Sequence, residues 1–126
     1  MRRPATLAEV AAWSDSLGAF SQYLAEFLDE FYLERRGAML EEEPARLIGK
    51  IHEGEVADAY LAATAVALAR LLGRRPPPWA MAVERRLEHP WFASRGPAIR
   101  ATLLVESPAS FRERNLFVSE NVLARA

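Results

Sequence analysis

Hydrophobic side chains recur at helical spacing through much of the chain. Between residues 17 and 31, leucines and phenylalanines follow one another at intervals of three and four, and polar residues, mostly acidic, fall elsewhere on the helical wheel. This pattern is typical of an amphipathic helix with one face on a core. Because residues 14–16 offer good N-caps, we expect a helix over about residues 16–35 that ends near Gly37.

A second long segment, residues 55–72, is apolar on nearly every side and rich in alanine. A helix without a polar face belongs at the centre of a domain, surrounded by other helices. Its alanines let those helices approach closely, and Gly73 is the expected C-cap. We therefore predict that residues 56–72 form the most buried helix of the protein.

Shorter segments complete a predicted all-α fold. The expected helices cover residues 7–13 after the capping box Thr6-Leu7-Ala8-Glu9, residues 41–48, residues 79–89, residues 97–105, a turn or helix from residue 107 and a last helix from residue 119. Residues 74–78 read as an extended connection too short to separate domains, and Leu116–Val118 as a lone extended stretch. The prediction is a single compact helical domain, residues 1–126, of six to eight helices around a buried, alanine-rich central helix.

The composition fits one folded domain. The chain has 126 residues, 51% of them hydrophobic, which is enough for a core. No apolar run reaches the roughly 18 residues that a membrane span needs, and no signal-peptide core follows the basic start Met1–Pro4. We therefore expect a cytoplasmic protein without a membrane partner. The absence of cysteine excludes disulfides and thiolate metal sites.

Charge divides the chain into an acidic and a basic half. Residues 1–60 hold 12 acidic and 6 basic side chains, and residues 61–126 hold 5 acidic and 10 basic ones, so the halves carry −6 and +5. One interpretation is a basic surface that meets an acidic partner or nucleic acid. The other is compositional, because 15 of the 16 basic residues are arginine and 23 residues are alanine, as a GC-rich genome would encode.

Candidate metal and catalytic motifs are incomplete. His52-Glu53-Gly54-Glu55 begins like a zinc-protease helix but lacks the second histidine. The stripe of Glu26, Glu30 and Glu34 lacks the Glu-x-x-His motifs of a di-metal centre and reads as a solvated face. No Gly-rich phosphate loop and no nucleophile beside a base is present. We therefore expect no catalytic residue, no metal and no cofactor, and predict that the protein is not an enzyme.

Three aromatic residues flank the segment after the proline run. Trp79, Trp91 and Phe92 lie among several arginines, a combination that can stack single-stranded bases. Core packing is the commoner role of such aromatics. Because Trp91 and Phe92 stand between the helix breakers Pro90 and Gly96, we predict that at least one of them plugs the core.

The C-terminal segment, residues 106–126, holds two helix-start signals, two phenylalanines and three arginines. This combination is typical of a docking surface, because arginine and aromatic side chains dominate interface energies. We predict that Phe111 and Phe117 anchor the segment on its own core, while Arg112 and Arg114 stay outside to bind carboxylates. The alternative is that these arginines decorate a helix end or pair with acids of the N-terminal half. The predicted partner-binding residues are Arg112, Arg114, Asn115 and Arg95.

Four segments together resemble a group of bacterial proteins. They are Asp58–Ala63, Pro78-Trp79, Pro90-Trp91-Phe92 and Glu106–Ser119. Over about residues 25–126 the chain resembles small uncharacterised antitoxin-like proteins whose genes often neighbour a nucleotidyltransferase-type toxin. The resemblance implies a non-enzymatic protein that binds and restrains such a toxin, and it implies no catalytic residues. Glu113 departs from the more uniformly basic Phe-Arg-x-Arg segment expected there, and the alternative function is a nucleic-acid-binding helical module that uses the C-terminal arginines.

Overall fold

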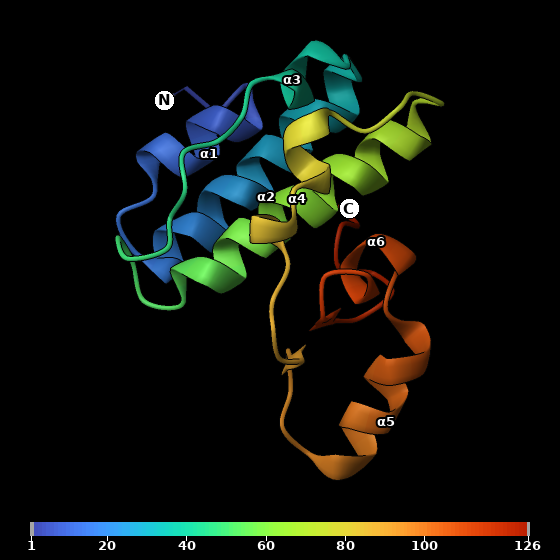
Figure 1. Ribbon diagram of the computed structural model, residues 1–126. Helices are drawn as coiled ribbons and strands as arrows, with labels where there is room; N and C mark the ends of the chain where they lie inside the picture. Colours follow the sequence, from blue (N-terminus) through green and yellow to red (C-terminus); the bar gives the residue numbers. More distant parts are fainter. Residues whose placement is uncertain (1, 126) are drawn as a thin grey trace.

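The structure, a computed structural model, describes residues 2–125 and has the predicted all-α character. Within those residues the regular elements are six α-helices, two short 3₁₀ turns and one two-stranded sheet (Figure 1). In chain order they are α1 (Leu7–Trp13), α2 (Leu17–Glu34), α3 (Ala38–Glu41), α4 (Gly54–Leu71), η1 (Pro78–Met81), η2 (Val83–Arg85), β1 (Trp91–Phe92), α5 (Pro97–Glu106), α6 (Ala109–Arg112) and β2 (Leu116–Phe117). None of the described helices has the length and apolar character needed to cross a membrane.

Helices α1 and α2 begin at the capping residues that the sequence predicts. The Thr6 hydroxyl accepts a hydrogen bond from the backbone N–H of Glu9 at 3.1 Å, and the Ser16 hydroxyl accepts one from Ala19 at 3.1 Å. Each bond satisfies a backbone donor that the first turn would leave free. α2 ends at Arg35, which takes a left-handed conformation (φ 50°) two residues before the predicted glycine stop.

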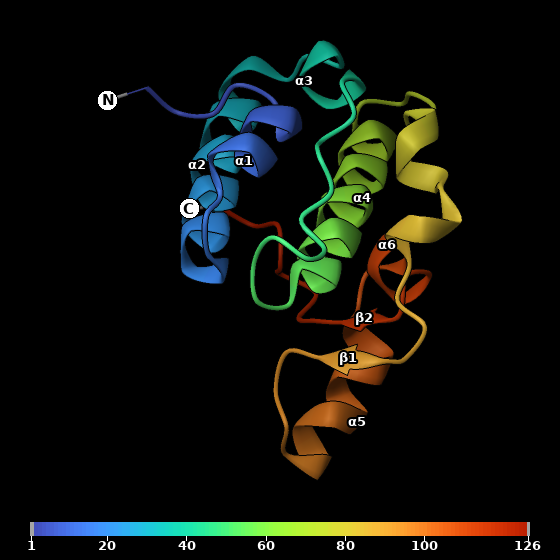
Figure 2. The same cartoon turned by 60° about the vertical axis from the view of Figure 1, so that its left-hand side comes forward.

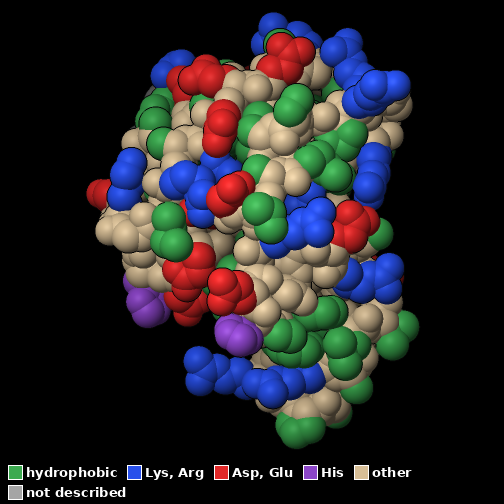
Figure 3. Space-filling model, viewed as in Figure 1, with side chains coloured by type: hydrophobic (Ala, Val, Ile, Leu, Met, Phe, Trp, Pro, Cys, Tyr) green, Lys and Arg blue, Asp and Glu red, His purple; other side chains and the backbone are tan. Residues whose placement is uncertain are grey.

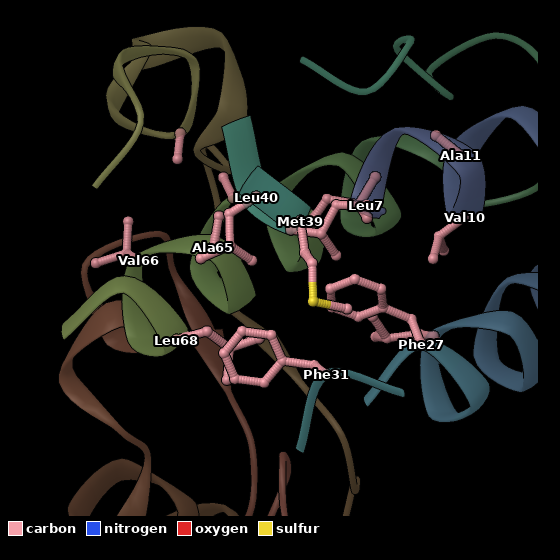
Figure 4. Packing of buried hydrophobic residues seen from close by; sticks show 14 of the residues in the cluster. Leu7, Val10, Ala11, Phe27, Phe31, Met39, Leu40, Ala65, Val66 and Leu68 are labelled. Carbon is pink, nitrogen blue, oxygen red and sulfur yellow. The ribbon is translucent and has the colours of Figure 1, made fainter. Parts of the chain in front are cut away.

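α4 is the central helix, as predicted. Thirteen of its 18 residues are buried, and its many alanines let α2, α6 and η1 pack against it. The predicted cap, Gly73, follows in a left-handed conformation (φ 68°). Figure 4 shows the larger core cluster, in which Leu7 of α1, Met39 of α3 and Phe27 of α2 lie close together and Leu68 of α4 lies beside Phe31 of α2.

A smaller cluster fixes the C-terminal segment to α4. Phe111 of α6, Leu116 of β2 and Val118 pack against apolar side chains of α4, and all three are almost completely buried. The predicted anchoring role of Phe111 is confirmed. Phe117 is only partly buried and stacks instead on Phe92, with 4.9 Å between the ring centroids.

The predicted helix over residues 41–48 is wrong. α3 ends at Glu41, residues 42–47 are irregular, and turns begin only at Ile48; Asp58 of α4 binds this segment. The buried Asp58 carboxylate accepts hydrogen bonds from the backbone N–H groups of Leu47 at 2.7 Å and Ile48 at 3.1 Å, and from Nε of Arg46 at 3.0 Å. Because these N–H groups bond to a side chain of another helix, they do not enter the ladder that a local helix needs.

Three further segments differ from the sequence prediction. Residues 79–89 form two 3₁₀ turns, interrupted at the extended Ala82, in place of one helix. Residues 120–123 form a turn in place of the predicted last helix. Leu116–Val118 is not a lone stretch, because β2 pairs in parallel with β1. A parallel pair needs a long crossover connection, and α5 lies within it.

β1, α5 and β2 form a small β-α-β unit, here called the distal lobe. Figures 1 and 2 show α5 at the lower end of the molecule, away from the bundle of α1 to α4. Leu103 is the one α5 residue that is buried. The lobe therefore leaves most of the α5 surface open to solvent.

Replacing Asp58 by alanine is expected to lower the free energy of unfolding by about 3–5 kcal/mol, because a buried guanidinium, that of Arg85, loses its buried counter-charge. The backbone N–H of Leu47 also loses its acceptor. Urea unfolding measures the loss. Glu55→Ala removes an exposed carboxylate from the first turn of the same helix and is expected to cost at most about 1 kcal/mol. Equal losses in the two variants would contradict the role given to Asp58.

Candidate partner-binding surface

The structure contradicts the prediction that Arg114 stays outside. Its side chain is fully buried, and its guanidinium donates hydrogen bonds to the carbonyl oxygens of Ser110 and Ala80, each at 2.8 Å. Burial lowers the pKa of this guanidinium, and the carboxylate of Glu113 acts in the opposite direction. A guanidinium carries several N–H donors in one plane, so it can bond to two carbonyl oxygens at the same time. Arg114 therefore joins α6 to η1 inside the protein, where a partner does not reach it.

Asn115 is also committed to the fold. It takes a left-handed conformation (φ 63°), which asparagine adopts more readily than most residues. Its side-chain amide donates a hydrogen bond to the carbonyl oxygen of Leu87 at 2.7 Å, and its own carbonyl accepts one from the N–H of Trp91 at 2.9 Å. These bonds join the start of β2 to the segment that leads into β1.

Arg95 and Arg112 are exposed, in agreement with the prediction for Arg112. Neither forms an ion pair with another described residue. Arg95 precedes α5, and Arg112 is the last residue of α6. Of the four residues predicted to bind a partner, these two have a free charge at the surface.

The outer face of α5 is the feature that the sequence analysis missed. It consists of Pro97, Ala98, Ala101, Leu104 and Val105, which fall on one side of a helix with 3.6 residues per turn. All five are exposed, Leu104 at 50% and Val105 at 79%. The buried Leu103 lies on the opposite side. In the sequence, residues 97–105 are apolar on both sides of the predicted helix. A helix of this kind is usually buried on both sides, so the pattern did not predict an exposed face.

Basic side chains border this apolar face. Residues 91–105 include Arg95 and Arg100 and no acidic residue. The Arg100 guanidinium lies over the ring of Phe92, 5.2 Å from its centroid. Figure 3 shows hydrophobic side chains gathered on the lower part of the molecule, with Lys or Arg side chains beside them. An apolar face with a positive rim is complementary to an apolar surface with acidic borders.

Buried hydrogen bonds hold α5 at its C-terminal end. The Ser107 hydroxyl lies 2.6 Å from the carbonyl oxygen of Leu103 and 2.9 Å from that of Val118, and it accepts a bond from the Val118 N–H at 2.8 Å. Before the helix, the N–H of Ala93 donates to the carbonyl of Phe117 at 3.0 Å. Hydrogen bonds thus fix the chain on both sides of α5 to β2 and Val118, and they hold the helix in one position.

The aromatic residues near the proline run do not form one platform. Trp79 is buried, its indole N–H donates to the carbonyl of Leu40 at 3.0 Å, and the Arg85 guanidinium covers its ring. Trp91 and Phe92 are half-buried, so neither is a full core plug, although Trp91 packs against the smaller cluster. Within residues 2–125 no group of three His, Cys, Asp or Glu side chains is placed to hold a metal.

Replacing Arg114 by alanine is expected to cost about 2–4 kcal/mol of unfolding free energy, because it leaves a cavity and two carbonyls without donors. Arg112→Ala removes an exposed guanidinium two residues away and is expected to cost no more than about 0.5 kcal/mol. Chemical denaturation of both variants, followed by tryptophan fluorescence, checks the difference. Similar small losses would contradict the burial of Arg114.

The outer face of α5 is therefore the candidate partner-binding surface, because its apolar side chains are exposed and arginine side chains border it. Contiguous exposed apolar faces of this kind mark sites of interaction with other molecules. No protein-family model, curated protein or solved structure matches the chain. A function for this protein is therefore argued from its sequence and its surface.

Proposed function

We propose that the protein is a non-enzymatic, antitoxin-like protein that binds its partner on the outer face of α5. One observation carries the proposal: five apolar residues lie uncovered on one side of a helix that projects from the bundle. Helices that present such a face commonly bind in a groove or against another helix of a partner. The partner would cover the face and remove it from water.

Covering the face would contribute apolar free energy to binding. Full burial of a valine or leucine side chain is worth roughly 1.5–3 kcal/mol, and on the outer face Val105 is 79% exposed and Leu104 50% exposed. At the rim of the face, the exposed Arg95 and Arg100 add charged groups that form paired hydrogen bonds with carboxylates. Apolar anchors surrounded by polar contacts are the usual arrangement of binding energy in an interface.

The sequence resemblance gives the partner in this proposal. It indicates a nucleotidyltransferase-type toxin encoded beside the gene, and the proposal places both proteins in the cytoplasm. The rim of Arg95 and Arg100, with no acid between residues 91 and 105, predicts acidic residues around the docking site on the toxin.

Nucleic acid is the second candidate partner. The unpaired charges of Arg95 and Arg112 favour it, because phosphate binding depends on free basic side chains. The exposed apolar side chains of Leu104 and Val105 favour a protein partner, because a protein offers apolar surface that can cover them and a phosphate backbone does not. The dependence of affinity on salt separates the two, since counter-ion release makes nucleic-acid binding fall steeply as salt rises.

Replacing Leu104 and Val105 together by serine is expected to weaken binding of the neighbouring gene product by about 2 kcal/mol or more, roughly 30-fold, because the apolar anchors are lost. The melting temperature should stay within a few degrees of the wild-type value, since both side chains are exposed. Calorimetric titration measures the affinity.

Val83→Ser is the matched control, because Val83 is 72% exposed on η2, outside the distal lobe. It should bind like the wild type. Unchanged affinity in the Leu104 and Val105 double variant would remove the outer face of α5 from the binding site. A neighbouring gene product that does not bind the wild-type protein would reject the toxin as the partner.

A further inference from the structure

A pocket lies between α2 and α4, beside the C-terminal residues 122–125. Its cavity volume is about 260 Å³, near the lower end of the range for small-molecule sites. One wall is a stripe of α2 that includes Phe20 and Leu24, and another is the first two turns of α4, with Val56 and Tyr60. Trp91 of β1 also lines the pocket. The pocket is thus distinct from the outer face of α5.

Three aromatic rings line this pocket. Phe20 and Tyr60 stand edge to face with their centroids 6.4 Å apart, and Tyr60 and Trp91 do the same at 6.3 Å. Burial raises the pKa of Tyr60 to about 12, so its ring remains an uncharged phenol at neutral pH. Phe20 is only 4% exposed, whereas Tyr60 and Trp91 are half-buried, so these two rings are the ones that a ligand can meet. The faces of such rings are electron-rich and attract cations.

Glu53 places a carboxylate at the same pocket. Its Oε2 accepts a hydrogen bond from the indole N–H of Trp91 at 3.1 Å, so one of the aromatic rings holds the carboxylate in position. The residue itself is in the left-handed region (φ 54°), a conformation that costs free energy for any residue with a side chain. The hydrogen bond to Trp91 therefore holds the Glu53 carboxylate next to the rings and offsets part of the cost of the left-handed backbone.

The positive groups near the pocket leave Glu53 without a strong counter-ion. Nε2 of His52 lies 3.6 Å from its Oε1, but that side chain is 84% exposed. Arg125 lines the pocket too, yet its guanidinium is bound to the carboxylate of Asp29 through two bonds of 2.8 and 3.2 Å. No Lys or Arg among the described residues pairs with Glu53.

We propose that this pocket binds a small organic cation, an alkylated ammonium group whose charge lies between the Glu53 carboxylate and the aromatic rings. Quaternary ammonium groups are recognised by aromatic rings in this way, and a carboxylate adds charge attraction. A short alkyl chain on the cation fits the aliphatic wall near Leu24 and Val56. A metal ion does not fit, because a single carboxylate is the one strong ligand at hand.

Binding of hexyltrimethylammonium chloride to the full chain tests the proposal. Isothermal titration should give one site, and hexanol and hexanoate, with the same chain length and no positive charge, should bind at least roughly tenfold more weakly. In a ¹⁵N spectrum, the indole signal of Trp91 should shift, while those of Trp13 and Trp79, which lie outside the pocket, should stay in place.

Glu53→Gln keeps the size of the side chain and removes the charge, and it should weaken the cation roughly tenfold without changing hexanol binding. Glu55→Gln is the matched control, because Glu55 is a neighbouring exposed carboxylate that does not line this pocket. If Glu53→Gln unfolds the protein, the comparison of the three ligands on the wild type still decides. Equal binding of cation, alcohol and acid, or no binding of the cation, overturns the proposal.

Discussion

The buried carboxylate of Asp58 is the interaction on which the rest of the fold depends. It lies on the central helix, with 1% of its side chain exposed, and it takes backbone and side-chain donors from residues 46–48. Its Oδ1 also lies 3.7 Å from the guanidinium of Arg85, which in turn donates to the carbonyl of Pro44 and covers Trp79. A buried charge is stable only when partners surround it, so this one group requires the irregular segments on both sides of α4 to adopt their observed paths.

A second buried charge organises the C-terminal third. Arg114 has no buried carboxylate beside it and is satisfied mainly by the carbonyls of Ser110 and Ala80. Those two carbonyls belong to α6 and η1, which are separated by about thirty residues of chain. In this small domain, whose apolar core is limited, hydrogen bonds from the buried Arg114 guanidinium therefore help to hold α6 and η1 together. Because α6 and β2 are fixed in this way, α5 can remain attached at its ends and open along its outer face.

The two sites inferred here use different parts of this framework. The outer face of α5 lies on a helix with a single buried residue, Leu103. The pocket beside Glu53 is built mainly from α2 and α4, which form most of the core, with Trp91 of β1 also in its lining. Surfaces that a fold does not need for its own packing are free to serve binding. The antitoxin-like role is a proposal from the sequence, and the exposed apolar face of α5 is the surface on which that proposal rests.

The sequence by itself determined the helices whose signals are local. Capping threonine and serine residues predict the starts of α1 and α2, regular apolar spacing predicts α2, and a proline in the first turn predicts α5. An alanine-rich stretch that is apolar on nearly every side predicts α4 and its central place. Only the tertiary structure decided the rest. Residues 41–48 are not a helix because Asp58, ten or more positions away, binds their N–H groups. Arg114 is inside because Ala80, 34 positions away, offers its carbonyl. Periodicity reports which face of a helix avoids water, whereas the burial of a charge depends on partners that the fold brings together.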